Sequence, residues 1–200
     1  YNIPDGNAIY IKSQTGFSDY YAQAGVWYGP LVDMNPFEGY LLNLTLPTSF
    51  TYNEGDDPLS RVILSDSYRD NIFDLNIHDY ENNGSMTVAL HHDGERLDSH
   101  GYMLAAFNQD QCVGYTEGMI FPLDGNMVFP LMVYGNEDNV PLTFKVYDVT
   151  TDSYFDINEK MIFTVDMHLG NGFDPVMMNI ADHPSSYAIG DPYPNPFNPS

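Results

Sequence analysis

The sequence predicts an all-β protein: an antiparallel β-sandwich, Ig-like or jelly-roll-like, with a small N-terminal unit that contains one short helix. Three observations predict this class. Apolar residues alternate with other residues along several segments, which is the period-2 pattern of half-buried strands. Turn-forming pairs such as Asp93-Gly94 and Asp124-Gly125 separate these segments. Sixteen glycines and fourteen prolines are spread along the 200 residues, as expected for many short strands joined by turns.

The first element expected is a short helix over residues 17–24. Phe17, Tyr20, Tyr21 and Ala24 have the i, i+3, i+4, i+7 spacing of one helix face. Gly25 follows directly, and a glycine at this position commonly ends a helix. No other segment sustains a 3.6-residue period, so strands and turns are expected elsewhere.

Strands are expected within residues 40–44, 86–91, 142–147 and 161–167, where the alternation is regular. Residues 104–107, Leu-Ala-Ala-Phe, are instead apolar without a break. That pattern is typical of a strand buried on both faces. These segments would supply the two packed sheets of the sandwich.

Changes in composition predict four parts. They are a small N-terminal β unit with the short helix over 1–55, a polar joint over 56–74, a β-sandwich module over 75–180 and a Pro-rich tail over 181–200. The last ten residues contain four prolines, which favour an extended chain. Because about 55 residues are marginal for independent stability, the N-terminal unit is expected to pack on the larger one.

The charge excludes several classes of partner. Six Lys and Arg stand against 28 Asp and Glu, for a net charge of −22. So few cations cannot neutralise a run of phosphates, so no nucleic-acid partner is expected. An anionic membrane surface would repel the chain, and no apolar run approaches the roughly 18 residues of a membrane span. The single Cys112 cannot form an internal disulfide and is expected to be a buried thiol.

Calcium is the metal that this acidic composition favours. Asp79, Glu81 and Asn83 place oxygen-bearing side chains at positions 1, 3 and 5 of a loop with Gly84 at position 6, as in an EF-hand. Position 12 falls on Leu90, where a bidentate Glu is needed, so an EF-hand is not expected. A looser structural calcium site stays open, and the alternative is that the carboxylates only keep the protein soluble. Its ligands would come from Asp56, Asp57, Asp66, Asp70, Asp74 and Asp79.

Three aromatic residues are the candidates for ligand binding. Trp27, Tyr28 and Tyr20 could form a platform on which a sugar ring stacks, although Trp27 fits equally well as core of the N-terminal unit. No catalytic residues are proposed, because no nucleophile elbow, phosphate-binding glycine loop or dinucleotide fingerprint occurs. The chain is therefore not expected to be an enzyme.

The tail carries the most specific motif. Residues 193–200, Tyr-Pro-Asn-Pro-Phe-Asn-Pro-Ser, resemble the opening of the C-terminal sorting domain of type IX secretion cargo, a family of Bacteroidetes, Chlorobi and related phyla. Stretches within 11–52 and 85–148 are similar to β modules of the same proteins, although Val113 stands where Arg is usual. The matching positions of the motif are Tyr193, Pro194, Asn195, Pro196, Phe197, Asn198 and Pro199.

The resemblance implies β modules immediately upstream of a sorting domain that would follow this chain. It implies secretion through that domain, with the secretion machinery as a partner, and an extracellular or cell-surface location. It names no ligand and no catalytic activity. Since the chain begins at Tyr1, we expect it to be a piece of a longer exported protein.

The expected function is therefore that of a non-catalytic extracellular structural or adhesive β module of a type IX secreted surface protein. Copies of itself and surface glycan are the further partners considered, and structural calcium is the one cofactor considered. The alternative is a carbohydrate- or surface-ligand-binding module of a secreted enzyme or adhesin.

Overall fold

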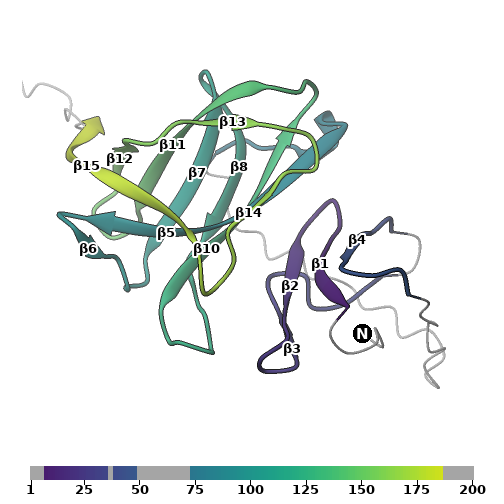
Figure 1. The fold of residues 1–200 in the computed structure, drawn as a ribbon. Helices are drawn as coiled ribbons and strands as arrows, with labels where there is room; N and C mark the ends of the chain where they lie inside the picture. The colour runs from purple at the N-terminus through teal and green to yellow at the C-terminus, as the bar shows by residue number, and fades with distance from the viewer. Residues whose placement is uncertain (1–6, 36–37, 49–72, 187–200) are drawn as a thin grey trace, which may run out of the picture.

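The computed structural model describes residues 7–35, 38–48 and 73–186, and it contains two β-sheets. Figure 1 shows a small sheet built from the start of the chain, which lies beside a large, strongly curved sheet built from later residues. The prediction of an all-β fold is confirmed. Within the described ranges, the one helical element is a single 3-10 turn, η1 (Ile77–Asp79). The described part of the chain contains no helix that could serve as a membrane span.

The small sheet has four antiparallel strands in the order β3-β2-β1-β4. They are β1 (Ala8–Lys12), β2 (Phe17–Tyr21), β3 (Val26–Tyr28) and β4 (Leu41–Leu44). Asp19 lies opposite Tyr10 of β1 on one side and opposite Tyr28 of β3 on the other. β2 is therefore an inner strand, with backbone partners along both edges.

The helix expected over residues 17–24 is wrong, because this segment forms β2 and the turn into β3. Phe17, Asp19 and Tyr21 lie on one face of β2 and are buried, as the two-residue period of a strand requires, and Ser18 on the other face is buried as well. Gly25 does adopt a left-handed conformation, with φ of 67°, but it does so in a hairpin turn. Its N–H and that of Ala24 donate to the Tyr21 carbonyl at 2.9 and 3.0 Å.

The large sheet has eleven strands. Its main path follows the order β8-β7-β11-β12-β15-β5-β10-β9, with β13 paired to β11 and with β6 and β14 paired to β5. Most pairs are antiparallel, but β14 and β15 both run parallel to β5, so the expected antiparallel sheet is a mixed one. The strands are β5 (Asn82–His92), β6 (Glu95–Arg96), β7 (Tyr102–Asn108), β8 (Gln111–Glu117), β9 (Met119–Ile120), β10 (Met127–Gly135), β11 (Val140–Asp148), β12 (Ser153–Ile157), β13 (Met161–Phe163), β14 (His168–Leu169) and β15 (Val176–Ser186).

The boundary expected between sandwich and tail cuts through β15. This strand continues to Ser186, and its last residues still pair with β12 through Phe155 opposite Pro184 and Tyr154 opposite Ser186. Residues 181–186, which the sequence assigned to the tail, are therefore part of the large sheet. The residues beyond 186 lie outside the described ranges.

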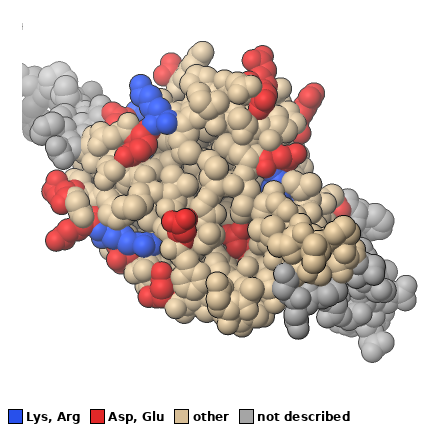
Figure 2. All heavy atoms as spheres, viewed as in Figure 1, with Lys and Arg blue, Asp and Glu red and all other residues tan. Residues whose placement is uncertain are grey.

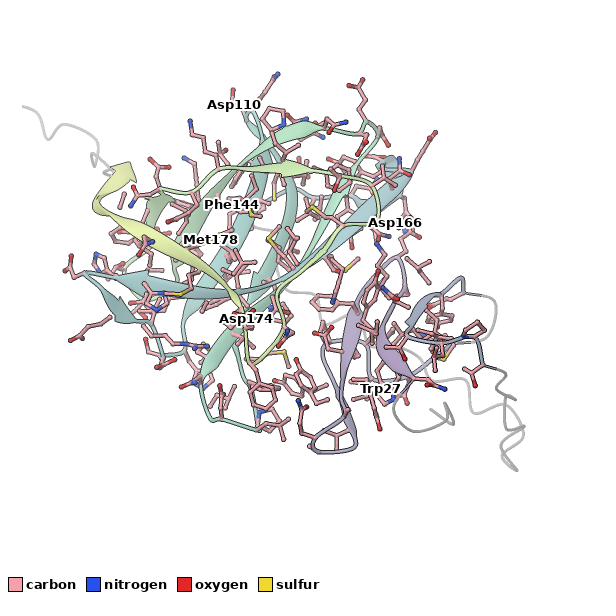
Figure 3. The ribbon with its side chains drawn as sticks, viewed as in Figure 1. Trp27, Asp110, Phe144, Asp166, Asp174 and Met178 are labelled. Atoms are coloured by element: carbon pink, nitrogen blue, oxygen red, sulfur yellow. The ribbon has the colours of Figure 1, made fainter. Side chains whose placement is uncertain are left out.

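The large sheet curls around one hydrophobic core in a barrel-like sandwich. Met86, Val88 and Leu90 of β5 point inward, as the alternation predicted, and none of them is exposed. Phe144 and Met178, from β11 and β15, lie inside the same core (Figure 3). Residues 104–106 in β7 are fully enclosed, as predicted for a strand buried on both faces, whereas Phe107 at the end of the predicted segment is half-buried.

The strand expected over 161–167 is only partly correct. β13 ends at Phe163, and the chain then turns, with the Met167 N–H donating to the Thr164 carbonyl at 3.1 Å. Asp166 has a left-handed φ of 63° within this turn. The turn brings Asp166 and the following β14 toward the small sheet, where both contribute to the site described below.

β10 explains how the two sheets fit together. Its inward residues join the core of the large sheet, while its outward residues Val128, Met132 and Tyr134 are buried as well. The small sheet covers this outward face, because Phe17 packs on Met132 and Tyr134 and Tyr21 packs with Val128. β10 is thus an apolar strand enclosed between two layers of structure.

The closure of the large sheet depends on a glycine where β8 passes β10. A Cβ added at Gly114 would collide with the Met132 carbonyl oxygen, which belongs to the backbone and cannot rotate away. We expect Gly114→Ala to lower the free energy of unfolding by about 3 kcal/mol, through overpacking. Urea denaturation measures the change. The control is Gly39→Ala, where an added Cβ meets no described atom within 4 Å, and equal effects of the two substitutions would contradict this account.

Candidate functional site: the seam between the two sheets

Several of the least exposed charged and polar groups among the described residues, including Lys12, Asp19 and Ser85, lie where β1 and β2 of the small sheet meet β5, β10 and β14 of the large one. We call this contact the seam. His168 lies at its centre, with Nε2 2.8 Å from Asp19 Oδ1 and Nδ1 2.8 Å from Ser85 Oγ. Its ring stacks on Tyr10 at a centroid distance of 3.8 Å and makes a T-shaped contact with Phe17 at 5.6 Å. One imidazole therefore ties two strands of different sheets together.

Ser85, His168 and Asp19 are the residue types of a hydrolytic triad, but their arrangement does not suit catalysis. In such a triad the serine faces Nε2 and the carboxylate faces Nδ1, which is the reverse of the order seen here. Ser85 is also 0% exposed, so a substrate carbonyl has no access to its Oγ. The set is a buried hydrogen-bonded bridge. Sequence analysis missed it because Asp19 and His168 are 149 residues apart.

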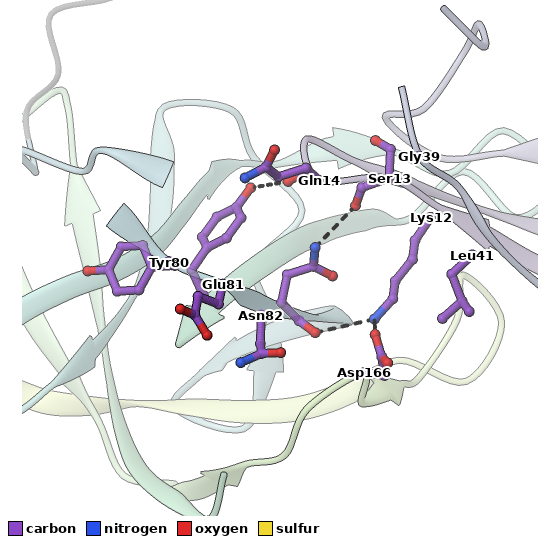
Figure 4. A pocket seen from close by; sticks show the side chains of 11 residues that line it. Lys12, Ser13, Gln14, Gly39, Leu41, Tyr80, Glu81, Asn82 and Asp166 are labelled. Atoms are coloured by element: carbon purple, nitrogen blue, oxygen red, sulfur yellow. Dashed lines mark hydrogen bonds and ion pairs between the residues drawn. The ribbon is translucent and has the colours of Figure 1, made fainter. Parts of the chain in front are cut away.

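Lys12 forms a second bridge across the seam. Its side chain is 2% exposed, and Nζ lies 3.0 Å from Asp166 Oδ1 and 3.3 Å from the Asn83 carbonyl oxygen. Asp166 itself is 61% exposed, so the pair has one buried and one solvated end. A buried ammonium requires such partners, because desolvation without them is costly. Figure 4 shows both contacts at the wall of a pocket.

Two tyrosine hydroxyls complete the seam. The Gly172 N–H donates to Tyr21 Oη at 2.7 Å, and Tyr134 Oη donates to the Gln14 carbonyl at 2.8 Å. Burial raises the pKa of both tyrosines above the ordinary value, so both hydroxyls stay protonated at neutral pH. They act as neutral hydrogen-bonding groups between the sheets.

A pocket of about 360 Å³ opens beside Lys12 at the seam, and we call it the seam pocket (Figure 4). A second pocket of about 220 Å³ lies near the turn from β10 to β11. Tyr80 and Tyr134 line both pockets. Asn83 Oδ1 is enclosed at the seam pocket and accepts no hydrogen bond from any described residue. It is the one side-chain acceptor of the seam left without a donor within the described ranges.

The structure places the three residues considered for calcium in different elements and surroundings. Glu81 and Asn83 line the seam pocket, and Asn83 Nδ2 donates to the Ser13 carbonyl at 3.4 Å. Asp79 belongs to η1, where its Oδ1 accepts from Asn76 Nδ2 at 2.9 Å. No group of three or more acidic, His or Cys residues within the described ranges could hold a metal ion. Structural calcium stays a prediction, since Asp56, Asp57, Asp66 and Asp70 lie outside those ranges.

The three aromatic candidates do not form one platform. Tyr20 and Trp27 lie opposite each other across β2 and β3, with ring centroids 5.3 Å apart, and both are half-buried. Tyr28 is the next residue in β3 and points to the other face, since side chains alternate along a strand. Its hydroxyl donates to the Ile120 carbonyl at 2.6 Å, and its ring packs on Phe121. Tyr28 therefore joins the seam, while Trp27 lies on the outer side of the small sheet (Figure 3).

Cys112 is a buried free thiol, as expected, at 5% exposure. Burial raises its pKa from the ordinary 9.0 to about 11. Its contribution to stability is therefore complete below about pH 9 and is lost as pH rises toward 11, because the unfolded chain ionises first. At pH 8 we expect the native thiol to react with a disulfide reagent at least about 100-fold more slowly than the urea-unfolded chain. Equal rates before and after unfolding would contradict the buried position.

The sorting motif at Tyr193–Pro199 lies outside the described residues, so the structure does not test it. No protein-family model, no curated protein and no solved structure matches this chain.

Proposed function

We propose that this chain is a non-catalytic structural or adhesive β module of a type IX secreted surface protein, acting as a rigid spacer or assembly unit. The observation that carries the proposal is the seam. Buried bridges through His168 and Lys12 fix the small sheet on the outward face of the large one. The described residues thereby form one body instead of two units on a linker, which suits a role based on shape.

The titratable groups support a structural role. Where the pKa of a described tyrosine or cysteine is strongly shifted, the shift is upward and burial is its largest cause. Nucleophiles that act near neutral pH need a lowered pKa and an accessible position. Cys112 has a raised pKa and is buried, and Ser85 is fully buried, so neither suits that role.

The proposed location draws on the tail motif and on charge. Figure 2 shows Asp and Glu scattered singly over one face of the molecule with few Lys or Arg among them. A net charge of −22 favours solubility outside the cell.

The test of the proposed location is to fuse residues 1–200 to a type IX sorting domain in a bacterium with that secretion system. Surface protease should then digest the fusion on intact cells, and a fusion retained inside the cell would contradict the proposal.

We expect calorimetry of residues 1–200 to give a single unfolding transition, because the seam couples the two sheets. The calorimetric and van't Hoff enthalpies should agree. Two separate transitions would show independent units and would remove the basis for a rigid spacer. Size-exclusion chromatography tests assembly in the same sample, and a strictly monomeric profile with and without residues 187–200, which leaves β15 intact, would exclude assembly through the tail.

A further inference from the structure

The two pockets described above share a wall. Tyr80 and Tyr134 line both of them, with ring centroids 6.0 Å apart and planes inclined by 33°. The two pockets are therefore neighbours, one beside Lys12 and the other at the turn between β10 and β11. We call the two pockets together with the tyrosine pair the tyrosine groove. Tyr134 is only 6% exposed and donates its hydroxyl to Gln14, so the half-buried Tyr80 is the ring with free surface.

Carboxamide side chains dominate the polar lining at both ends of the groove. A carboxamide donates and accepts hydrogen bonds at once, which matches the dual character of a hydroxyl group. The carboxamides are Gln14, Asn82 and Asn83 in the seam pocket and Asn108, Gln111 and Asn136 in its neighbour.

The charges in the groove select against ions of either sign. Of the described residues that line it, Lys12 is positive and three, Glu81, Asp166 and Glu137, are negative. Lys12 is already paired with Asp166, so an anionic ligand would face the two remaining acids. A metal cation in the seam pocket would instead approach the buried ammonium of Lys12. A neutral ligand rich in hydroxyls fits both constraints.

We propose that the tyrosine groove binds a short neutral oligosaccharide, with one sugar ring packed on Tyr80 and sugar hydroxyls hydrogen-bonded to the carboxamides that line the seam pocket. The seam pocket, at about 360 Å³, is within the size range of small-ligand sites. This site is separate from Trp27, which lies on the outer side of the small sheet. The proposed sugar binding goes beyond the structural role and does not depend on that role, since a rigid module without sugar affinity would still be a spacer.

The experiment is saturation-transfer NMR on residues 1–200 with cellobiose, maltose and N,N′-diacetylchitobiose, and with digalacturonic acid as the charged probe. We expect at least one neutral disaccharide to bind and the acidic one to bind more weakly. Backbone chemical-shift changes should centre on residues 80–83 and 134–136. No transfer from any neutral probe at about ten millimolar, or shift changes centred on Trp27, would overturn the proposal.

Variants locate the site. Tyr80→Ala should weaken binding at least about tenfold through loss of ring packing, whereas Tyr80→Phe should retain it. Glu81→Gln should narrow the gap between digalacturonic acid and the neutral probe. Trp27→Ala is the matched aromatic control outside the groove and should bind as the unaltered chain does. If Tyr80→Ala does not fold, Glu81→Gln and the shift map decide, and unchanged selectivity in Glu81→Gln would count against the groove.

Discussion

His168→Leu is expected to lower the free energy of unfolding by about 3 kcal/mol. The substitution removes the hydrogen bonds to Asp19 and Ser85 and the stacking on Tyr10. The Asp19 carboxylate, at 8% side-chain exposure, then keeps only a 3.5 Å contact with the Tyr21 hydroxyl. A buried charge without partners costs far more than the same charge in water. Urea denaturation at neutral pH measures the loss.

A second substitution separates this cause from a simple loss of packing. If the unpaired carboxylate is responsible, the double variant Asp19→Leu with His168→Leu should be more stable than His168→Leu alone, because both ends of the bridge become apolar. The matched control is His100→Leu, at an exposed position, which should change stability by less than about 0.5 kcal/mol. A double variant no more stable than the single one would show that shape, and not charge, holds the seam.

Much of the large sheet could be predicted from periodicity. Apolar residues alternate with other residues over 86–91 and 142–147, because one face of β5 and one face of β11 meet the core. This alternation can be read from the sequence alone. The helix over 17–24 was wrong for a related reason. Phe17 and Tyr21 are four residues apart, a spacing that fits both a helix face and every second residue of a strand. Asp19, between them, is a charged residue that would not be expected on a buried face. Its burial is explained by His168, and this partner is known only from the structure.

The seam itself was beyond sequence reasoning, because its partners come from distant parts of the chain. One clue was present, however. Residues 127–134, Met-Val-Phe-Pro-Leu-Met-Val-Tyr, are apolar without a break, and such a strand needs cover on both faces. The calcium pattern at Asp79, Glu81 and Asn83 does not lie in one loop, because η1 ends at Asp79 and β5 begins at Asn82. Calcium binding by these three residues stays a prediction.

Phe17→Ala is expected to have the largest effect of any substitution in the small sheet, about 3–5 kcal/mol. Phe17 is 1% exposed, packs on Met132 and Tyr134 of β10, and presents its edge to His168 at 5.6 Å. Truncation leaves a cavity that the surrounding β-sheets are too rigid to fill. Phe173→Ala is the control, because Phe173 is 50% exposed and should lose much less.

The shape of the transition is as informative as its midpoint. Phe144 lies in the core of the large sheet and Phe17 at the seam. If the seam makes the two sheets one cooperative unit, Phe17→Ala and Phe144→Ala should both shift a single transition, whether it is followed by fluorescence or by far-UV circular dichroism. If Phe17→Ala instead splits the curve and leaves the later part unchanged, the small sheet unfolds on its own. The rigid-module proposal would then fail at its central contact.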